Sequence, residues 1–314
     1  MIESHALSLK HFLINLTRPY KGLFSVMALV GATYAFTTTF TPYVLKLIID
    51  HVVEFPGVKS DLFKTTQPYL FAYIGLWIII CTNMRLLNWI EYKLFPSLRE
   101  DTMSQMFRYL NQHSHHYFQN NFAGSLVNKI TDMQSGVINI FTILHDIYSQ
   151  ILGITVATVT LLFIHPIFSV ILLGWAFTFL AITIFFLKSI VHLSHIFAES
   201  KTTAVGKMVD SISNIVNVRL FAKYEIENQY IDQSIKLAVQ KDREMQARIL
   251  NMRIYWDISI IVLMSLNLFI LLYMYSKNLV TIGDFTFVIS LSISILWNLW
   301  FLASQFGPKL RSLR

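Results

Sequence analysis

Residues 147–187 read IYSQILGITVATVTLLFIHPIFSVILLGWAFTFLAITIFFL, and these 41 consecutive positions contain no Asp, Glu, Lys or Arg. An α-helix needs about 20 apolar residues to cross a membrane, so this stretch is long enough for two crossings. The dipeptide His165-Pro166 lies near its centre. Because proline cannot continue a helical hydrogen-bond ladder and disfavours helix in the residue before it, we predict a tight hairpin of two membrane-spanning helices.

Four further stretches without ionised side chains each have the length of one crossing. They are Gly22–Leu45, Thr65–Met84, Ile258–Ser276 and Phe285–Pro308, with 24, 20, 19 and 24 residues. The chain of 314 residues is 54% hydrophobic and 14% charged, whereas about 25% of the residues of a soluble domain are charged. We therefore predict an all-α membrane protein. Its six transmembrane helices are expected at about 22–49, 68–92, 141–164, 167–188, 255–276 and 284–308.

The 25 Lys and Arg residues are unevenly distributed between the two sides of the membrane that these crossings define. With a cytoplasmic N-terminus, about twenty lie inside, and only Lys59, Lys64 and Lys277 lie outside. Because cytoplasmic loops carry an excess of Lys and Arg, we expect both termini in the cytoplasm. We expect a multi-pass protein of the bacterial cytoplasmic (inner) membrane. The net charge of +7 then reflects topology and attraction to the lipid bilayer, so no nucleic acid partner is expected.

Residues 1–21 are amphipathic and lack the apolar core of a signal peptide. Apolar side chains recur on one face of this segment at helical spacing. They are Leu9, Phe12, Leu13 and Leu16. We predict a short elbow helix in the inner membrane interface, followed by a six-helix domain over residues 22–310.

Two long segments between spans, at about 93–140 and 189–254, are predicted to lie in the cytosol. The second contains no proline, and its apolar residues keep helical spacing. At about 1.5 Å per residue, each half of such a segment is long enough to extend well beyond the membrane. We therefore predict two cytoplasmic helical hairpins, whereas the longest external segment, residues 51–64, contains a turn at Pro56-Gly57.

The tip of the first hairpin, at residues 117–132, reads YFQNNFAGSLVNKITD. An aromatic residue is followed six positions later by glycine, and then by leucine, a basic residue and aspartate. This pattern is similar to the first intracellular loop of ATP-binding-cassette (ABC) exporters. The resemblance implies a coupling helix that docks on a nucleotide-binding domain. Its candidate residues here are Asn120, Asn121, Gly124, Asn128, Lys129 and Asp132.

The second hairpin carries VRLFAKYEIE at residues 218–227, which is similar to the stretch after the second coupling helix of the same family. The candidate residues there are Ser211, Asn214, Val218, Arg219 and Glu227. The resemblance extends over nearly the whole chain and includes Ile282-Gly283-Asp284 at the start of the last span. It implies the ABC exporter transmembrane-domain fold. Tyr224 and Gln119 stand where the family often has acids, so the contacts of those acids are not carried over.

None of the 11 glycines belongs to a phosphate-binding loop of the form G-x-x-x-x-G-K-[ST]. We therefore expect no ATPase site, no catalytic residue and no cofactor in this chain. The resemblance implies that ATP and Mg²⁺ bind to a nucleotide-binding domain, either after residue 314 of a longer polypeptide or on a separate chain. It also implies a second transmembrane half, in a homodimer or a heterodimer. The histidines near residues 113–116 and 192–195 lack cysteines or organised carboxylates beside them, so no metal site is expected.

One face of the last predicted span carries four polar side chains that are candidates for a transport path. They are Ser290, Ser294, Asn298 and Gln305. Polar groups within a membrane point to a neighbouring helix or to a water-filled cavity. The stripe therefore either lines a path or bonds helices together.

Two charged residues, Arg85 and Lys46, lie near the ends of predicted spans. Arg85 and Asn88 share a face near the inner end of the second span, where Arg85 either binds an anionic group or extends to the interface. Lys46 and Asp50, four positions apart at the outer end of the first span, are expected to form an ion pair at the interface.

The sequence as a whole favours the permease domain of an ATP-driven exporter that moves a drug, lipid or peptide by alternating access. A membrane protein that is not driven by ATP, such as a channel-like assembly or a scaffold, is the alternative. A phosphate-binding loop in the reading frame after Arg314, or in an adjacent frame, distinguishes the exporter from this alternative.

Overall fold

The computed structural model describes residues 9–120 and 123–311, which are helical apart from short turns. The helices in these ranges are α1 (Leu9–Thr17), the 3-10 helix η1 (Arg18–Tyr20), α2 (Lys21–Val53), α3 (Lys59–Leu110), α4 (His115–Asn120), α5 (Ala123–Leu162), α6 (Pro166–Ser213), α7 (Ile215–Leu220), α8 (Tyr224–Ser276) and α9 (Ile282–Arg311). Among the described residues, six helices are long and apolar enough to cross a membrane, namely α2, α3, α5, α6, α8 and α9. The prediction of an all-α protein with six such helices is confirmed.

The turn predicted at His165-Pro166 separates α5 from α6. The first helix ends at Leu162, and Pro166 is the first residue of the next. Proline is tolerated there because the N–H group at the first position of a helix makes no hydrogen bond within the helix. The hydroxyl of Ser169 donates a hydrogen bond of 2.9 Å to the carbonyl oxygen of Thr158 across the turn. One stretch without charge therefore forms two helices.

The long helices extend beyond the charge-free stretches that predicted them. The helix α3 has 52 residues, and it continues past Arg85 for another 25 residues to Leu110. At the other end it begins at Lys59, so the turn at Pro56-Gly57 is confined to residues 54–58. A charged residue is costly in hydrocarbon but fits a helix in water, so charge indicates the membrane boundary and leaves the helix end undetermined.

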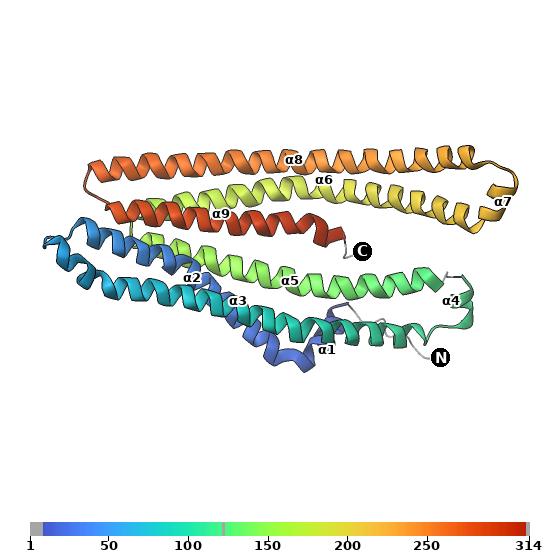
Figure 1. The fold of residues 1–314 in the computed structure, drawn as a ribbon, viewed down its shortest axis with the longest axis horizontal. Helices are drawn as coiled ribbons and strands as arrows, with labels where there is room; N and C mark the ends of the chain where they lie inside the picture. Colours follow the sequence, from blue (N-terminus) through green and yellow to red (C-terminus); the bar gives the residue numbers. More distant parts are fainter. Residues whose placement is uncertain (1–8, 121–122, 312–314) are drawn as a thin grey trace. The chain divides into compact units, whose positions relative to one another are not determined.

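The chain folds into two compact units, residues 1–170 with 266–314, and residues 171–265. In the first unit, α2 packs against α3, α5 and α9, and α5 also contacts α3 and α9 (Figure 1). In the second unit, α6 and α8 form the two arms of a helical hairpin, and the short helix α7 lies at its tip (Figure 1).

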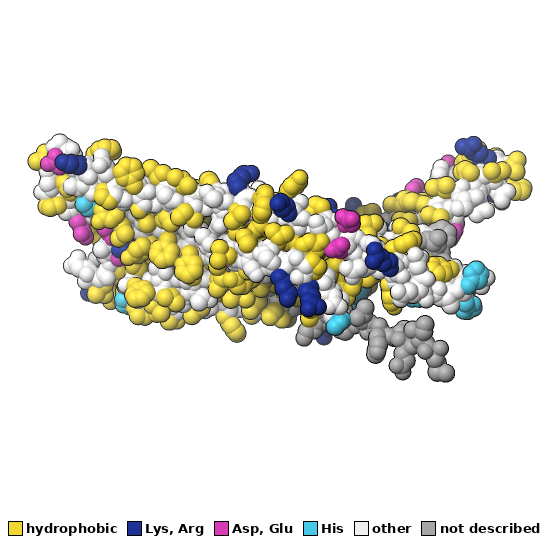
Figure 2. All heavy atoms as spheres, turned by 90° about the horizontal axis from the view of Figure 1, so that it is seen from below, with side chains coloured by type: hydrophobic (Ala, Val, Ile, Leu, Met, Phe, Trp, Pro, Cys, Tyr) yellow, Lys and Arg dark blue, Asp and Glu magenta, His cyan; other side chains and the backbone are white. Residues whose placement is uncertain are grey.

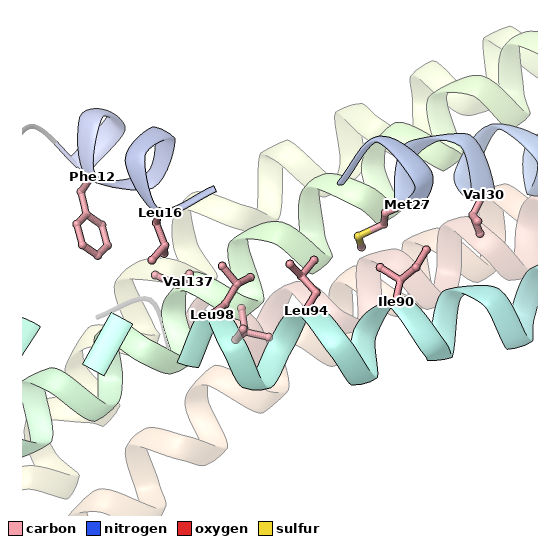
Figure 3. Close-up of a cluster of buried hydrophobic side chains, with 9 residues drawn as sticks. Phe12, Leu16, Met27, Val30, Ile90, Leu94, Leu98 and Val137 are labelled. Atoms are coloured by element: carbon pink, nitrogen blue, oxygen red, sulfur yellow. The ribbon is translucent and has the colours of Figure 1, made fainter. Parts of the chain in front are cut away.

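Buried apolar side chains join the elbow helix α1 to the rest of the first unit (Figure 3). They are Phe12 and Leu16 of α1, Met27 and Val30 of α2, Ile90, Leu94 and Leu98 of α3, and Val137 and Ile138 of α5. The three α3 residues recur every four positions and therefore share one face of their helix. Part of the apolar face predicted to lie in the membrane interface is thus covered by protein.

Aromatic side chains pack between the two arms of the second unit. The rings of Phe179 and Trp256 stack with centroids 4.9 Å apart. The indole N–H of Trp256 donates to the hydroxyl of Thr183 at 3.2 Å, and that of Trp175 donates to Ser259 at 3.3 Å. Because hydrocarbon offers no hydrogen-bond partners, these hydroxyls satisfy indole groups that would be costly to leave unpaired in a membrane.

Large apolar side chains are exposed along the long helices, and Figure 2 shows hydrophobic side chains over much of the surface. Leu29 is 66% exposed, Phe71 70% and Phe269 74%. A soluble protein rarely exposes so much contiguous apolar surface. Lipid covers such a surface when the helices cross a bilayer, so the exposure agrees with the six spans.

Candidate functional site

A cavity of about 270 Å³ lies between α2, α3, α5 and α9 in the first unit. Its walls are mainly apolar, and polar side chains from all four helices reach it. The lining residues are Val30, Gly31 and Tyr34 of α2, Asn83, Met84 and Leu87 of α3, His145, Asp146, Ser149 and Gln150 of α5, and Asn298 and Phe301 of α9.

Helical spacing brings these residues to the cavity. Gly31 and Tyr34 are three positions apart on α2, and His145 and Ser149 are four positions apart on α5, so each pair shares a helix face. Tyr34 lies in the middle of a charge-free stretch, as Asn298 does in the last span. Met84, His145 and Asp146 lie at the edges of such stretches, so the cavity extends from one edge of the spans to membrane depth.

Two hydrogen bonds between helices hold polar groups at the cavity. The phenol of Tyr34 donates to Oδ1 of Asn298 at 3.1 Å, which joins α2 to α9. The side-chain amide of Asn83, a buried residue, donates to the carbonyl oxygen of Val30 at 3.3 Å, which joins α3 to α2. These groups link the helices and also form part of the polar lining.

Gly31 allows α2 and α5 to approach each other beside the cavity. A Cβ atom at this position would lie 2.5 Å from Oγ of Ser149 and 3.0 Å from Cε1 of His145. Small residues permit close packing of membrane helices in this way. Because Gly31 has no side chain, α2 and α5 can lie close together, and space remains open in the cavity.

Replacing Tyr34 by phenylalanine tests the link between α2 and α9. We expect Tyr34→Phe to cost about 1 kcal/mol of unfolding free energy, because the hydrogen bond to Asn298 is lost. The thermal unfolding midpoint in detergent should fall by about 2 to 4 °C. Tyr273→Phe is the matched control, since Tyr273 is 64% exposed. An equal effect of the two changes would contradict the assigned contact.

Only part of the predicted transport path meets at this cavity. Asn298 lines it, whereas Ser290 and Ser294 are half-buried on α9 and are not among the lining residues. Gln305 belongs to α9, but its side chain lies outside the described part of the structure. Arg85 and Asn88 are exposed on α3 and are not among the lining residues.

Several lining residues could not be identified from the sequence, because other polar residues stand beside them and nothing distinguishes those that reach a cavity. Tyr34 is preceded by Thr33 and followed by the threonines at 37–39, and Asn83 follows Thr82. His145 and Asp146 did offer a signal, since they are two ionisable residues directly before the longest charge-free stretch. Tertiary packing alone brings these residues to one cavity.

The tip of the first hairpin consists of α4 and the start of α5. The rings of His113 and Tyr117 pack with centroids 4.3 Å apart beside α4. Of the residues predicted for the first coupling helix, Asn120 ends α4, and the position of Asn121 lies outside the described residues. The others belong to the first turns of α5, and all but Gly124 are exposed. They are Gly124, Asn128, Lys129 and Asp132.

The tip of the second hairpin is a tight turn after α7. The backbone of Ala222 has a φ of 50°, in the left-handed region. Its N–H donates to the carbonyl of Arg219, and the N–H of Lys223 donates to the carbonyl of Val218, both at 3.2 Å. Such bonds satisfy the last carbonyl groups of a helix and end it.

The residues predicted for the second coupling region lie around this turn. Ser211 is buried near the end of α6, Asn214 precedes α7, and Glu227 lies in the first turn of α8. Val218 and Arg219 belong to α7, and Arg219 is exposed.

Exposed apolar side chains form a patch at the second tip. It comprises Ile212, Val216, Leu220, Phe221 and Ile226, which are 63–74% exposed. The patch lies far along the chain from the charge-free stretches ending at Leu187 and beginning at Ile258. Lipid is therefore not available to cover it, and an apolar surface of this kind is typical of a protein contact.

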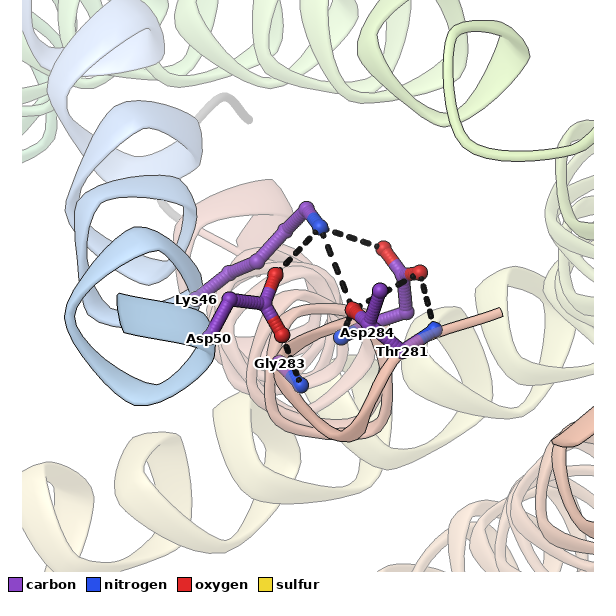
Figure 4. Close-up of polar contacts among 5 residues, drawn as sticks. All are labelled: Lys46, Asp50, Thr281, Gly283 and Asp284. Carbon is purple, nitrogen blue, oxygen red and sulfur yellow. Dashed lines mark hydrogen bonds and ion pairs between the residues drawn. The ribbon is translucent and has the colours of Figure 1, made fainter. Parts of the chain in front are cut away.

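An ionic network joins the C-terminal end of α2 to the start of α9 (Figure 4). The ammonium group of Lys46 lies 2.8 Å from a carboxylate oxygen of Asp50 and 2.8 Å from one of Asp284. The three side chains are only 12%, 17% and 7% exposed. The ion pair predicted for Lys46 and Asp50 is confirmed, and Asp284 is a third member that chain spacing did not indicate.

Backbone groups at the start of α9 complete this network. The N–H of Gly283 donates to Asp50 at 2.7 Å, and a Cβ at residue 283 would lie 2.5 Å from that carboxylate. Thr281 and Asp284 form a capping box, because the N–H of Thr281 donates to Asp284 and the N–H of Asp284 donates to the Thr281 hydroxyl.

Among the described residues, no group of three or more His, Cys, Asp or Glu side chains is placed to hold a metal ion. A comparison with protein families matches residues 24–299 to the ABC transporter transmembrane region. The matched range contains both hairpin tips, the ionic network and all but one of the cavity-lining residues. A comparison with curated proteins finds no match.

Proposed function

The chain belongs to the ABC transporter transmembrane region family, and we propose on this basis that it is the permease domain of an ATP-driven exporter. It moves a hydrophobic or amphipathic substrate, such as a drug, lipid or peptide, across the membrane by alternating access. We further propose that both termini are cytoplasmic, because Lys and Arg are concentrated on that side of the spans, and that the membrane is a bacterial cytoplasmic membrane.

The cavity at membrane depth is the observation that carries this proposal. Apolar walls with a few converging polar groups are typical of sites for small, largely hydrophobic molecules. Tyr34, Asn83 and Asn298 supply hydrogen-bonding groups on three different helices. An amphipathic substrate matches both parts of this lining.

The size of the cavity supports a second transmembrane half. Its volume of about 270 Å³ is below the usual range of about 300–1,000 Å³ for drug-sized ligands. One chain therefore encloses only part of a path. We propose that a second half, identical or similar to this chain, supplies the rest.

The two hairpin tips are proposed to dock on nucleotide-binding domains, which bind the ATP and Mg²⁺. The exposed patch at the second tip supports this contact, since Leu220 and Phe221 are 74% and 71% exposed. A stiff helical arm can transmit a rigid-body movement from such a domain to the membrane. Closure of the domains around ATP would in this way change the side of the membrane to which the cavity opens.

The transport claim is tested with the complete protein and its nucleotide-binding domain in proteoliposomes. Substrate should stimulate ATP hydrolysis, and Leu220→Asp should reduce coupled transport at least tenfold because it places a charge in the docking patch. Leu237→Asp is the matched control, since Leu237 is an exposed leucine elsewhere on the same hairpin. Transport that needs no nucleotide, or equal transport by the two variants, would contradict the proposal.

A further inference from the structure

A groove in the second unit has no role in the proposed transport path. It has a volume of about 880 Å³ and lies between α6 and α8. Its apolar wall includes Ala181, Ile182 and Ile258, and its polar groups include Arg248 and Asn251. The groove therefore combines one strongly basic group with a long apolar surface.

The guanidinium group of Arg248 has a buried donor that is not used within the described part of the structure. The group lies 4.6 Å from the centroid of the Phe186 ring, and its Nε is buried without a hydrogen-bond partner. Glu244, one helical turn earlier, is held instead by Lys241, whose ammonium group lies 3.0 Å from both carboxylate oxygens. A half-buried cation beside apolar side chains is stabilised by an anion that also fills its unused donors.

The position of the groove along the helices matches the inner membrane boundary. Phe186 is one residue from the end of the charge-free stretch on α6, which closes at Leu187. On α8, Arg248 precedes the charge-free stretch, whereas Ile258 is its first residue. The groove thus runs from the headgroup level at Arg248 into the hydrocarbon.

We propose that this groove binds an anionic phospholipid of the inner leaflet. The phosphate lies on Arg248 and Asn251, because a guanidinium group binds phosphate through parallel N–H···O bonds and the Asn251 amide adds a donor. An acyl chain lies along Ala181, Ile182 and Ile258. A phospholipid supplies the anion and the apolar chain in one molecule, and it surrounds the groove in the membrane. This inference does not depend on what the protein transports.

Native mass spectrometry of the complete protein tests the proposal. The protein is released from detergent micelles that contain equal amounts of phosphatidylglycerol and phosphatidylcholine with the same acyl chains. We expect the wild type to retain phosphatidylglycerol at least fivefold over phosphatidylcholine, and Arg248→Gln to bring this ratio close to one. Arg253→Gln is the matched control, because Arg253 is an exposed arginine on the same helix outside the groove.

A second variant tests the apolar half of the groove without changing its charge. Ala181→Trp fills the groove and should lower retention of phosphatidylglycerol at least threefold. Equal lipid ratios in Arg248→Gln and Arg253→Gln would overturn the proposal. So would an Ala181→Trp variant that changes the number of subunits and leaves lipid retention intact, because the groove would then be an interface with a second copy. Thermal stabilisation by inorganic phosphate alone, equal to that by phosphatidylglycerol, would also overturn it.

Discussion

Lys46→Met is expected to lower the unfolding free energy by about 3 kcal/mol or more. The ammonium group of Lys46 lies 2.8 Å from carboxylate oxygens of both Asp50 and Asp284. Without this cation, two largely buried carboxylates remain close together and uncompensated, and removing one partner of a buried ion pair typically costs about 3–5 kcal/mol. The thermal unfolding midpoint in detergent should fall by roughly 6 to 12 °C.

Two further variants distinguish loss of the network from general sensitivity to substitution. Lys277→Met is the matched control, because Lys277 is an exposed lysine near the same end of the spans. Adding Asp284→Asn to Lys46→Met removes one of the two uncompensated charges and should recover part of the midpoint. A midpoint for Lys46→Met equal to that of Lys277→Met would show that the network does not stabilise the fold.

Gly31→Leu is expected to reduce transport at least tenfold, by closing the cavity and separating α2 from α5. The added Cβ would meet Ser149 at 2.5 Å and His145 at 3.0 Å, and the rest of the leucine side chain must then enter the cavity or displace α5. Overpacking of a close contact typically costs about 1–3 kcal/mol, so the thermal midpoint should fall as well. Transport in proteoliposomes and thermal unfolding measure the two effects.

Gly153→Leu is the matched control for this change. Gly153 belongs to α5 of the same unit, and a Cβ there would meet nothing within 4 Å. Gly31→Ala should have a smaller effect than Gly31→Leu, because the Ser149 hydroxyl can rotate away from a single methyl group. Full transport by Gly31→Leu would mean that this cavity is not part of the path.

The six-helix fold could be predicted from the sequence because a membrane restricts the chain so strongly. Every backbone N–H and C=O group must be bonded within the chain in hydrocarbon, so a charge-free stretch of sufficient length is helical. Pro166 then located the turn between two helices. The end of α3 could not be found in this way, since residues from Arg85 to Leu110 extend as helix without the apolar pattern of a span.

The candidate site was predicted only in part. Asn298 was found because it belongs to a polar stripe along one helix, and such a stripe is visible in a single segment. Tyr34, its hydrogen-bond partner, lies in a span that also contains Thr33 and the threonines at 37–39 and 41, so nothing in the sequence singles it out. Which polar group of a span lines a cavity depends on the side chains of neighbouring helices.

The amino-acid sequence by itself determined how many membrane-spanning helices there are and in what order, because burying charge in hydrocarbon is costly for any arrangement of the helices. Only the tertiary structure decided which helix faces meet. Tyr34 and Asn298 are 264 positions apart, and Asp50 and Gly283 are 233 positions apart. Their contacts arise from the packing of whole helices, in which missing side chains at Gly31 and Gly283 set how closely the backbones approach.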